Sequence, residues 1–280
     1  MGRKRAGTQR TILFLLAVAV GALIVWLAGC DKIASTFRSL RKSTISKTEH
    51  VPPRAPSRAG EGPKLAILLD DLGSDPAAAE AIFALRQPLT ISVLPFHAHS
   101  TEIAEEAGEH GIQVMLHLPM EAVGNTLPEP QELHVGMTTA EVAAEVSAML
   151  GSVPTAVGVN NHEGSSATTD SRLMAELMPL LKQKSLYFVD SRTTAATVAL
   201  DAARQAGLRC GSRNVPFLDD VEEVGAIRKE LELAIRGAEE KGAAIAIGHP
   251  HKETLEALRE MLPKIKARGV RLVYVSEVVR

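Results

Sequence analysis

The sequence has few aromatic residues, only two cysteines and almost no excess of charge. Aromatic residues make up 3% of the chain, so the core must be built mainly from Ala, Val, Ile and Leu, as in buried parallel strands and the helices that cover them. The two cysteines, Cys30 and Cys210, lie far apart in the sequence, which excludes a disulfide framework. The net charge of -2 gives no reason to expect a nucleic-acid partner.

Two further patterns are missing. No Gly-x-Gly-x-x-Gly motif follows the first predicted strand, which argues against a nucleotide cofactor. No unit of about 20 to 50 residues is repeated, which argues against a solenoid. The 280 residues, 45% of them hydrophobic and 23% charged, have the balance of an ordinary globular protein.

The first thirty residues are predicted to be an export signal. Arg3, Lys4, Arg5 and Arg10 precede an almost unbroken apolar run over residues 12–29. A charged start followed by an apolar segment is typical of signal peptides, although a run of about 18 residues is also long enough to span a bilayer. In both cases the positive charges stay inside, so the rest of the chain is expected on the outer face of a membrane.

The end of this run, Leu27-Ala28-Gly29-Cys30, resembles the lipobox of bacterial lipoproteins, in which a peptidase cuts before the cysteine and the thiol carries a lipid. The resemblance implies that Cys30 is lipidated and that acyl chains hold the mature protein at the membrane. The alternative is an uncleaved N-terminal helix that anchors the chain. Asp31 resembles the signal that retains lipoproteins in the inner membrane of Gram-negative bacteria, so the periplasmic face of that membrane is the expected location.

Residues 31–63 are predicted to be a flexible tether, and residues 64–280 a single α/β domain. The tether is rich in Ser, Thr, Arg, Lys and Pro and has no apolar period. From Lys64 onward, short apolar runs alternate with helical periods. The runs predicted to be strands are 65–69, 89–94, 112–116, 156–159, 186–189, 243–247 and 272–275.

Helical periods separate most of these strands. They cover 75–85, 100–110, 139–150, 171–182, 221–241 and 252–268. The first starts at Asp75-Pro76, a capping residue followed by proline at the first helical position. Strands that alternate with helices pair in parallel through right-handed crossovers. About seven such units favour an α/β fold of the deformed (β/α) barrel type over an open Rossmann sheet.

Polar residues of the kinds that bind metals follow most of the predicted strands. They are Asp70, Asp71, His117, Asn160, His162, Asp190 and His249. The carboxyl ends of barrel strands converge on one face, where the catalytic groups of such barrels lie. Imidazole and carboxylate are typical ligands of zinc, and catalytic zinc sites leave one position open. The pattern therefore predicts a divalent metal, with Zn²⁺ expected, that activates water near neutral pH.

Each of these residues has a simpler interpretation when it is taken alone. A single Asp after a strand is more often a cap or turn residue than a base, and a single His is more often a surface residue than a ligand. Five other histidines are assigned to that class: His97, His99, His110, His134 and His251. What distinguishes the predicted ligands is that several of them fall on corresponding ends of separate strands. Cys210 is expected to be a buried thiol without a role.

Five segments of the predicted domain occur in a characteristic order. They are Asp70-Asp71-Leu72-Gly73, His117-Leu118-Pro119-Met120-Glu121, Gly158-Val159-Asn160-Asn161-His162-Glu163-Gly164-Ser165, Val189-Asp190-Ser191 and Gly248-His249-Pro250. Together they resemble the divergent polysaccharide deacetylase family, a distant branch of the NodB-type carbohydrate esterases. The resemblance covers nearly all of residues 64–280. It implies a deformed (β/α) barrel and metal-dependent removal of acetyl groups from an acetylated polysaccharide or a peptidoglycan-type glycan.

The resemblance also implies roles for individual residues. Asp70 would be the general base, and His249 would be the late catalytic histidine. Asp71 and His117 would be metal ligands, and His162 is expected to complete the metal site in this branch. Substrate binding or support of the ligands is expected of four more residues: Glu121, Asn160, Asn161 and Asp190.

The sequence departs from the usual NodB-type pattern at three places. Glu121 stands where a second metal-binding histidine usually follows the first. Asn160-Asn161-His162 replaces the usual Arg-Pro-Pro motif, and Glu163 stands where this branch usually has an apolar residue. These departures leave open an alternative, a saccharide-binding or envelope-scaffolding protein that kept the fold and lost the chemistry. A third hypothesis is a metal-free barrel whose strand-end residues only cap helices.

Overall fold

The computed structural model describes residues 62–124, 129 and 131–280. The predicted export signal, Cys30 and the tether up to residue 61 lie outside the described residues. Within the described ranges, no helix is both long enough and apolar enough to cross a membrane.

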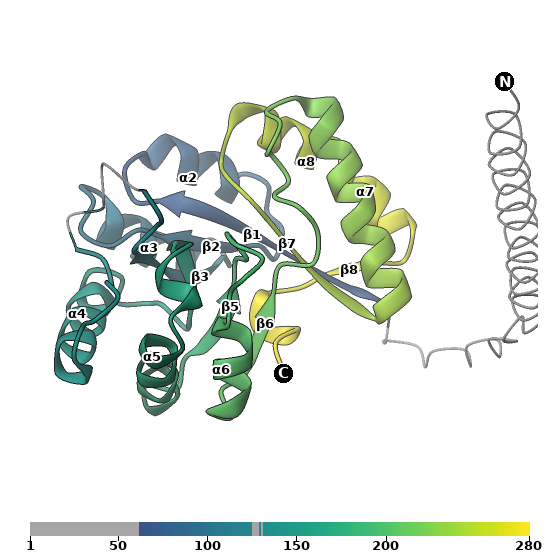
Figure 1. Cartoon of the computed structure of the whole chain (residues 1–280). Helices are drawn as coiled ribbons and strands as arrows, with labels where there is room; N and C mark the ends of the chain where they lie inside the picture. Colours follow the sequence, from purple (N-terminus) through teal and green to yellow (C-terminus); the bar gives the residue numbers. More distant parts are fainter. Residues whose placement is uncertain (1–61, 125–128, 130) are drawn as a thin grey trace, which may run out of the picture. The chain divides into compact units, whose positions relative to one another are not determined.

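The described chain forms one sheet of eight parallel strands that curves into a nearly closed barrel (Figure 1). Along the sheet the order is β6-β5-β4-β3-β2-β1-β7, and β8 pairs with the start of β1. The sequence prediction of a barrel with about seven parallel strands is confirmed. The strands are β1 (Lys64–Leu72), β2 (Thr90–Val93), β3 (Gln113–Met120), β4 (Gly158–Glu163), β5 (Tyr187–Asp190), β6 (Cys210–Ser212), β7 (Ala243–Gly248) and β8 (Arg271–Leu272).

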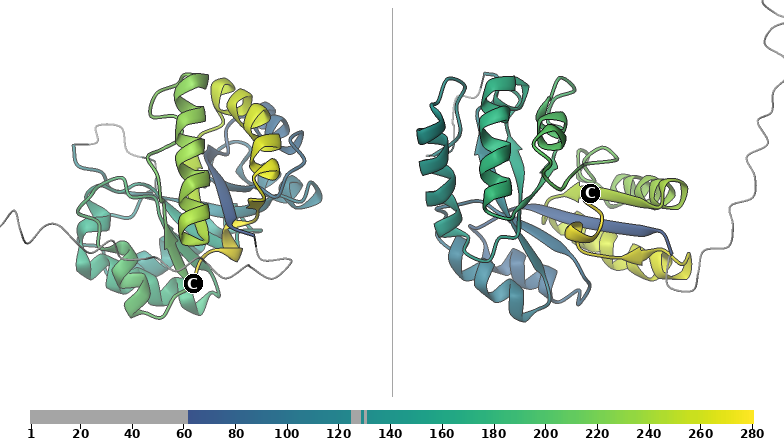
Figure 2. Two further views of the ribbon diagram at one scale, coloured as in Figure 1. Left: turned by 90° about the vertical axis from the view of Figure 1, so that its right-hand side faces the viewer. Right: turned by 90° about the horizontal axis from the view of Figure 1, so that it is seen from below.

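Helices cover the outside of this sheet (Figure 2). The cap predicted from the sequence is present, because the Asp75 side chain accepts a hydrogen bond from the Ala77 N–H and Pro76 starts the helix. Thr138 and Glu141 form a reciprocal capping box at the start of a second helix. The helices are α2 (Pro76–Phe83), α3 (Ser100–Glu109), α4 (Thr139–Ser152), α5 (Ser171–Gln183), α6 (Ala199–Gln205), α7 (Val224–Lys241) and α8 (Lys252–Ala267).

The side chains of β1 alternate between two apolar cores. Leu65, Ile67 and Leu69 belong to the large core that the sheet shares with the helices. Ala66 and Leu68 belong to a smaller core inside the barrel. Because side chains of a strand alternate between its faces, the next inward position on β1 is residue 70. The inner core is filled mainly by aliphatic residues, as the low aromatic content predicts: Ala66, Leu68, Met115, Tyr187, Val189, Ile245, Ile247, Val273, Val275 and Val279.

Several strand bounds differ from the sequence prediction, and β3 and β4 extend to Met120 and Glu163, beyond the predicted ends at residues 116 and 159. The predicted strand 272–275 is reduced to the two residues of β8, because a 3₁₀ turn over Val275–Glu277 follows it. The backbone N–H of Val275 donates a hydrogen bond to Thr90 Oγ1 (3.1 Å), which fixes this turn against β2. β6 is not predicted from the sequence because its three residues, Cys-Gly-Ser, are too few to give an apolar period.

The segment after β6 bridges the gap between the two ends of the sheet. The Asn214 N–H donates to the Ile245 carbonyl (3.0 Å), and Asn214 Oδ1 accepts from the Ile245 N–H (2.7 Å). Further along, the Leu218 N–H donates to the Ile247 carbonyl (2.8 Å). These bonds satisfy the edge of β7 that would otherwise be unpaired, so the segment acts as a partial strand that nearly closes the barrel.

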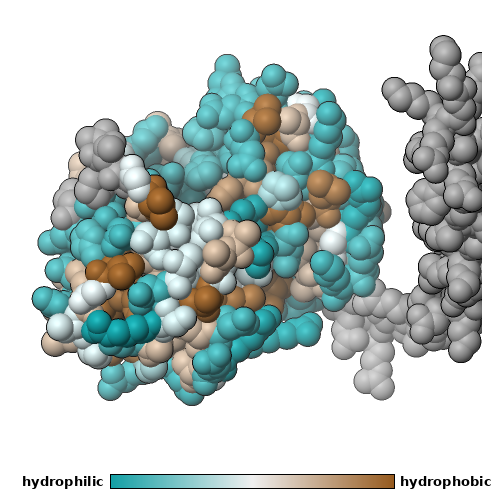
Figure 3. Space-filling model, in the orientation of Figure 1, coloured by the Kyte–Doolittle hydropathy of each residue, from teal (hydrophilic) through white to brown (hydrophobic). Residues whose placement is uncertain are grey.

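The face of the domain drawn in Figure 3 is mainly polar. On this face, hydrophobic residues form small, separated patches among hydrophilic ones. The exposed large apolar residues of the described chain are also scattered over the sequence: Phe96, Val123, Val135, Val157, Val221 and Leu233. Apolar residues that are exposed singly in this way are normal on a folded domain.

We predict that Gly158→Ala destabilises the barrel. Gly158 pairs with Tyr187 across β4 and β5, and a Cβ on Gly158 would lie 2.4 Å from the Tyr187 ring. The ring has little freedom to move, since it is buried and its hydroxyl donates to Gln113 Oε1 (2.9 Å). Overpacking of this kind lowers the free energy of unfolding by about 1–3 kcal/mol.

Gly151→Ala is the matched control, because a Cβ on this exposed glycine of α4 would meet nothing within 4 Å. It is expected to raise the free energy of unfolding by about 0.5–1 kcal/mol through helix propensity. Urea unfolding followed by circular dichroism measures both. Equal midpoints for the two variants would contradict the prediction.

Candidate active site

The predicted site residues lie at the carboxyl ends of the strands, where the inward-facing positions change from apolar to polar. On β1, Asp70 continues the inward row of Ala66 and Leu68, and on β3, His117 follows the inward Met115. His117 pairs in register with Asn160 of β4. The parallel register therefore brings carboxylate, imidazole and amide to one level at the end of the barrel.

Asp71 faces the same site although it directly follows Asp70. Consecutive residues of a regular strand point to opposite faces, but Asp71 has a φ of 60°, and the pairing of β1 with β2 is irregular between Leu69 and Leu72. As a result both carboxylates approach His117. Its Nε2 atom lies 3.0 Å from Asp71 Oδ1 and 3.7 Å from Asp70 Oδ2.

His162 joins Asp71 and His117 to form a group of possible metal ligands. It lies two residues after Asn160 on β4, and its Nδ1 atom is 3.1 Å from Asp71 Oδ1. The rings of His117 and His162 meet edge to face, with centroids 4.8 Å apart. One donor atom from each of the three residues lies within 4.8 Å of the other two. The structure thus brings together the three residues that the sequence analysis named as ligands.

The two adjacent aspartates have opposite pKa shifts. Burial alone would raise the pKa of Asp71, but hydrogen bonds from His117 and His162 outweigh it and hold that pKa well below its usual range. Burial raises the pKa of Asp70, in spite of the nearby charge of His117, which opposes the shift. Environments that separate the pKa values of two neighbouring carboxyl groups are typical of sites that give them different roles.

His249 is held by a buried carboxylate that the sequence analysis did not identify. Asp219 Oδ1 lies 2.9 Å from His249 Nδ1, and Asp219 Oδ2 accepts from the His249 backbone N–H (2.6 Å) and the Thr254 hydroxyl (2.8 Å). Burial opposes the charge on His249, but the bond to Asp219 outweighs it and raises the pKa of His249 to about 9. His249 Nε2 lies 3.7 Å from Asp71 Oδ2, so this imidazole points into the site.

Gly248 allows the Asp219 loop to lie close to the end of β7 and to His249. A Cβ at Gly248 would lie 3.1 Å from both Asp219 Oδ2 and Leu218 Cβ, so a larger residue would push the Asp219 loop away. Asp219 has no strand-end signal in the sequence, because it follows the irregular segment that bridges β6 and β7.

Three predicted residues support loops and lie apart from the ligand group. Glu121 accepts hydrogen bonds from the Val135 N–H (2.8 Å) and the Ser166 hydroxyl (2.9 Å). Asp190 accepts from the Arg192 N–H (2.8 Å) and the Thr197 hydroxyl (3.0 Å).

The third, Asn161, donates to the Glu163 carbonyl (2.8 Å) and accepts from the Ser191 N–H (2.9 Å), which ties the end of β4 to the segment after β5. None of the three belongs to a group of possible metal ligands among the described residues.

Four of the five histidines assigned to surface or structural roles have local partners. His97, His99 and His134 lie 3.3, 2.7 and 3.4 Å from Glu129, Glu102 and Glu132, and His110 stacks on Phe83. The fifth, His251, differs, because it forms a second group of possible ligands with Asp219 and His249. The Asp219 carboxylate in that group already accepts three hydrogen bonds, so we interpret it as the partner of His249.

The site also contains two serines that the strand-end pattern does not predict. Ser92 and Ser191 both bond to Asn160. The sequence contains a signal for Ser92, since Thr90 and Ser92 alternate with Ile91 and Val93 in a strand that is buried throughout. Polar residues at every second position of a buried strand indicate a polar interior.

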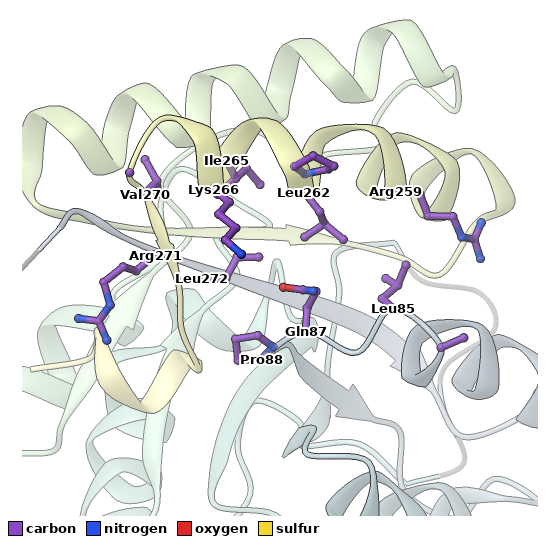
Figure 4. A pocket seen from close by; sticks show the side chains of 13 residues that line it. Leu85, Gln87, Pro88, Arg259, Leu262, Ile265, Lys266, Val270, Arg271 and Leu272 are labelled. Atoms are coloured by element: carbon purple, nitrogen blue, oxygen red, sulfur yellow. The ribbon is translucent and has the colours of Figure 1, made fainter. Parts of the chain in front are cut away.

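A separate hollow of about 840 Å³ lies away from this site, between α8 and the segment joining α2 to β2 (Figure 4). Its lining includes Leu85, Leu262 and Leu272 and the basic residues Arg259 and Lys266. It contains no carboxylate or imidazole, so it offers no groups for the predicted hydrolysis.

Comparison with known proteins identifies relatives of the whole domain. The divergent polysaccharide deacetylase family matches residues 67–279. An uncharacterized protein of Haemophilus influenzae is 38% identical over 196 residues, which are 70% of this chain and 70% of that protein. The uncharacterized protein YibQ of Escherichia coli K12 is 37% identical over 199 residues, which are 71% of this chain and 62% of that protein.

Two solved structures share the fold. An uncharacterized protein from Agrobacterium tumefaciens C58 superposes with a TM-score of 0.74 at 21% identity, over 80% of this chain and 92% of that one. A family 4 carbohydrate esterase from Streptomyces lividans, in complex with acetate, superposes with a TM-score of 0.50 at 14% identity, over 75% and 91%. The family match spans the barrel from β1 to the C-terminal segment, and as the sequence motifs predict, the chain belongs to the divergent polysaccharide deacetylase family.

Proposed function

We propose that this protein is a metal-dependent hydrolase that removes acetyl groups from a polysaccharide of the bacterial cell envelope. The observation that carries the proposal is the group of Asp71, His117 and His162, which lies between the buried Asp70 and the Asp219–His249 pair. The family supports a polysaccharide as the substrate class. The acetate bound by the Streptomyces lividans esterase, which has the same fold, supports acetyl chemistry.

The three donors fit a zinc ion. Zinc is commonly bound by imidazole nitrogen and carboxylate oxygen, and catalytic sites use three protein ligands. The side chains of Asp71 and His162 are 39% and 19% exposed, so the group is open to solvent on one side, where water and substrate can enter. When bound, zinc would lower the pKa of water and polarise a carbonyl group.

Asp70 is placed to act as the general base. It is buried, and Asn160 holds its carboxylate through bonds of 3.0 and 3.1 Å. Because burial raises its pKa, Asp70 takes up a proton more readily than an exposed aspartate does. In the proposed reaction Asp70 accepts the proton that water loses as its oxygen bonds to the acetyl carbon.

His249 is placed to act as the general acid on the other side of the site. Its raised pKa of about 9 keeps the imidazole protonated at neutral pH. The acetyl C–N or C–O bond breaks, His249 gives its proton to the departing amine or alcohol, and acetate is released. Asp70 then returns its proton to solvent and His249 takes one up, so the two residues regain their starting states.

The proposed location rests on the N-terminal sequence. A charged start, an apolar run and Cys30 support export and anchoring at the outer face of the inner membrane, through a lipid on Cys30 or through an uncleaved helix. A tether over residues 31–63 would let the barrel reach a glycan at some distance from the membrane.

The alternative of a saccharide-binding protein without activity depends on departures from the usual motifs, among them Glu121, which stands where a metal-binding histidine usually lies. Glu121 makes its hydrogen bonds to Val135 and Ser166, while His162 contributes a third donor from β4. The replacement therefore does not leave the ligand group one donor short. This completeness supports the enzyme over the binding protein.

We predict that the full chain, purified in detergent, binds about one Zn²⁺ and releases acetate from N-acetylated or O-acetylated oligosaccharides. Asp70→Asn should retain zinc but lower kcat by about 10²–10⁴-fold, because it removes the base and leaves all three donors. Asp71→Asn should lose zinc and activity together, because a ligand is removed. Bound metal is measured by mass spectrometry, and acetate by a coupled assay.

His99→Gln is the control, because this partly exposed histidine pairs with Glu102 near the start of α3 and belongs to neither group of possible ligands. It should match the unchanged protein in both measurements. Zinc bound without acetate release from any glycan would favour the saccharide-binding alternative. No zinc even after it is supplied would exclude the catalytic proposal.

We further predict that Asp219→Asn moves the alkaline limb of the pH–rate profile to lower pH. The Asp219 carboxylate stabilises the protonated form of His249, so its removal lowers the pKa of His249 from about 9 toward its ordinary value. Activity that requires protonated His249 should then fall between roughly pH 6.5 and 9, where the unchanged protein retains it. Asp220→Asn, on the exposed neighbour, should leave the limb in place. Identical profiles for the two variants would contradict the role of Asp219.

A further inference from the structure

Asn160 contacts both parts of the site. Its Oδ1 atom lies 3.2 Å from His117 Nδ1 and also accepts a hydrogen bond from the Ser92 hydroxyl. Its Nδ2 atom donates to Asp70 Oδ1 (3.0 Å), Asp70 Oδ2 (3.1 Å) and Ser191 Oγ (3.0 Å). The side chain is completely buried, so these contacts are made without competition from solvent.

The contacts determine which way the amide points. An asparagine side chain has two acceptor positions and two N–H donors, and here every one of them has a partner. Turning the amide over would place its oxygen against the Asp70 carboxylate, where two acceptors would repel each other. Oδ1 must therefore face His117, and because Oδ1 can only accept, His117 Nδ1 must carry the proton.

We propose that Asn160 is a positioning residue that aligns the general base and one metal ligand with a single side chain. Through Oδ1 it keeps the proton on Nδ1 of His117, so that Nε2 faces Asp71 and the ligand group. Through Nδ2 it fixes the Asp70 carboxylate beside that group. The proposal deepens the proposed function and rests on it for the role of Asp70 as base.

The role in metal binding follows from general behaviour of metal sites. A histidine ligand usually donates its second ring N–H to a neighbouring acceptor, which fixes the tautomer and the ring orientation. Loss of such an acceptor typically weakens metal affinity or activity by about 10–100-fold. Asn160 is the acceptor at Nδ1 of His117, whereas His117 Nε2 lies near the two aspartates.

Asn161 provides a matched comparison. It is the next residue on β4, is equally buried and also makes side-chain hydrogen bonds, to the Glu163 carbonyl and the Ser191 N–H. Its side chain leaves the strand on the opposite face and bonds to neither His117 nor Asp70. If the two side chains contributed only packing and hydrogen bonds, Asn161→Ala and Asn160→Ala should have similar effects. The positioning role predicts that only Asn160→Ala changes the environment of His117 and Asp70.

The experiment compares three variants of the full chain in detergent micelles. Two-dimensional NMR of ¹⁵N-histidine-labelled, zinc-loaded protein detects the Nδ1–H of His117, and competition with a chelating dye gives the Kd for Zn²⁺. Asn160→Ala should lose the protected Nδ1–H signal and raise the Kd by about 10–100-fold. Asn161→Ala should keep the signal and change the Kd by less than about threefold.

Asn160→Asp separates the two halves of the role. When ionised, its carboxylate can still accept from His117 but has no N–H to donate to Asp70, so the Nδ1–H signal and zinc affinity should persist while kcat falls at least about tenfold. This variant keeps the size of the side chain, and it tests the proposal even if Asn160→Ala does not fold.

Persistence of the Nδ1–H signal and zinc affinity in Asn160→Ala would overturn the proposal, as would equal losses in Asn160→Ala and Asn161→Ala. Unchanged kcat in Asn160→Asp would overturn the proposed role of Asn160 in positioning Asp70. If the unchanged protein releases no acetate, the proposed function fails, but the NMR signal and the zinc Kd still decide whether Asn160 positions His117.

Discussion

The inner face of the barrel changes from apolar to polar at a single level, and the site depends on this change. Below that level Leu68 and Met115 fill the interior, and above it Asp70 and His117 continue the same inward rows. Because the strands are parallel and in register, the polar positions of neighbouring strands coincide. An isolated charge at this depth would be costly, so these groups persist only because they bond to one another.

Asn160 bonds to the Asp70 carboxylate without adding another charged group to the polar level. A buried lysine or arginine beside Asp70 would add a charge that itself needs desolvation and partners. The neutral amide instead connects Asp70, His117, Ser92 and Ser191 and leaves none of its own atoms unpaired. It also leaves Asp70 without a cation on that side, so burial remains the dominant influence on its pKa.

Sequence patterns predicted the barrel and most of the site because both depend on local regularities. Apolar runs that end in Asp or His locate the strand ends, and parallel pairing then brings Asp71, His117 and His162 together. The position of Asp219 could not be predicted in this way, because it follows an irregular segment whose path is set by contacts with β7. The family resemblance implies that Glu121 binds substrate or supports the ligands, yet the end of β3 directs its carboxylate toward Val135 and Ser166.

The irregular segment after β6 links closure of the barrel to the placement of the proposed acid. Asn214, Leu218 and Asp219 bond in turn to Ile245, Ile247 and His249, so one run of chain follows β7 from the middle of the strand to the site. The Arg213 guanidinium lies 4.0 Å over the Phe217 ring, whose centroid is 5.6 Å from that of His249, which packs the segment against the imidazole. The ligand group belongs to the regular part of the barrel, on β1, β3 and β4. The proposed acid is instead held by the segment that nearly closes it, so a shift of this segment would move His249 relative to Asp71 without disturbing the ligands.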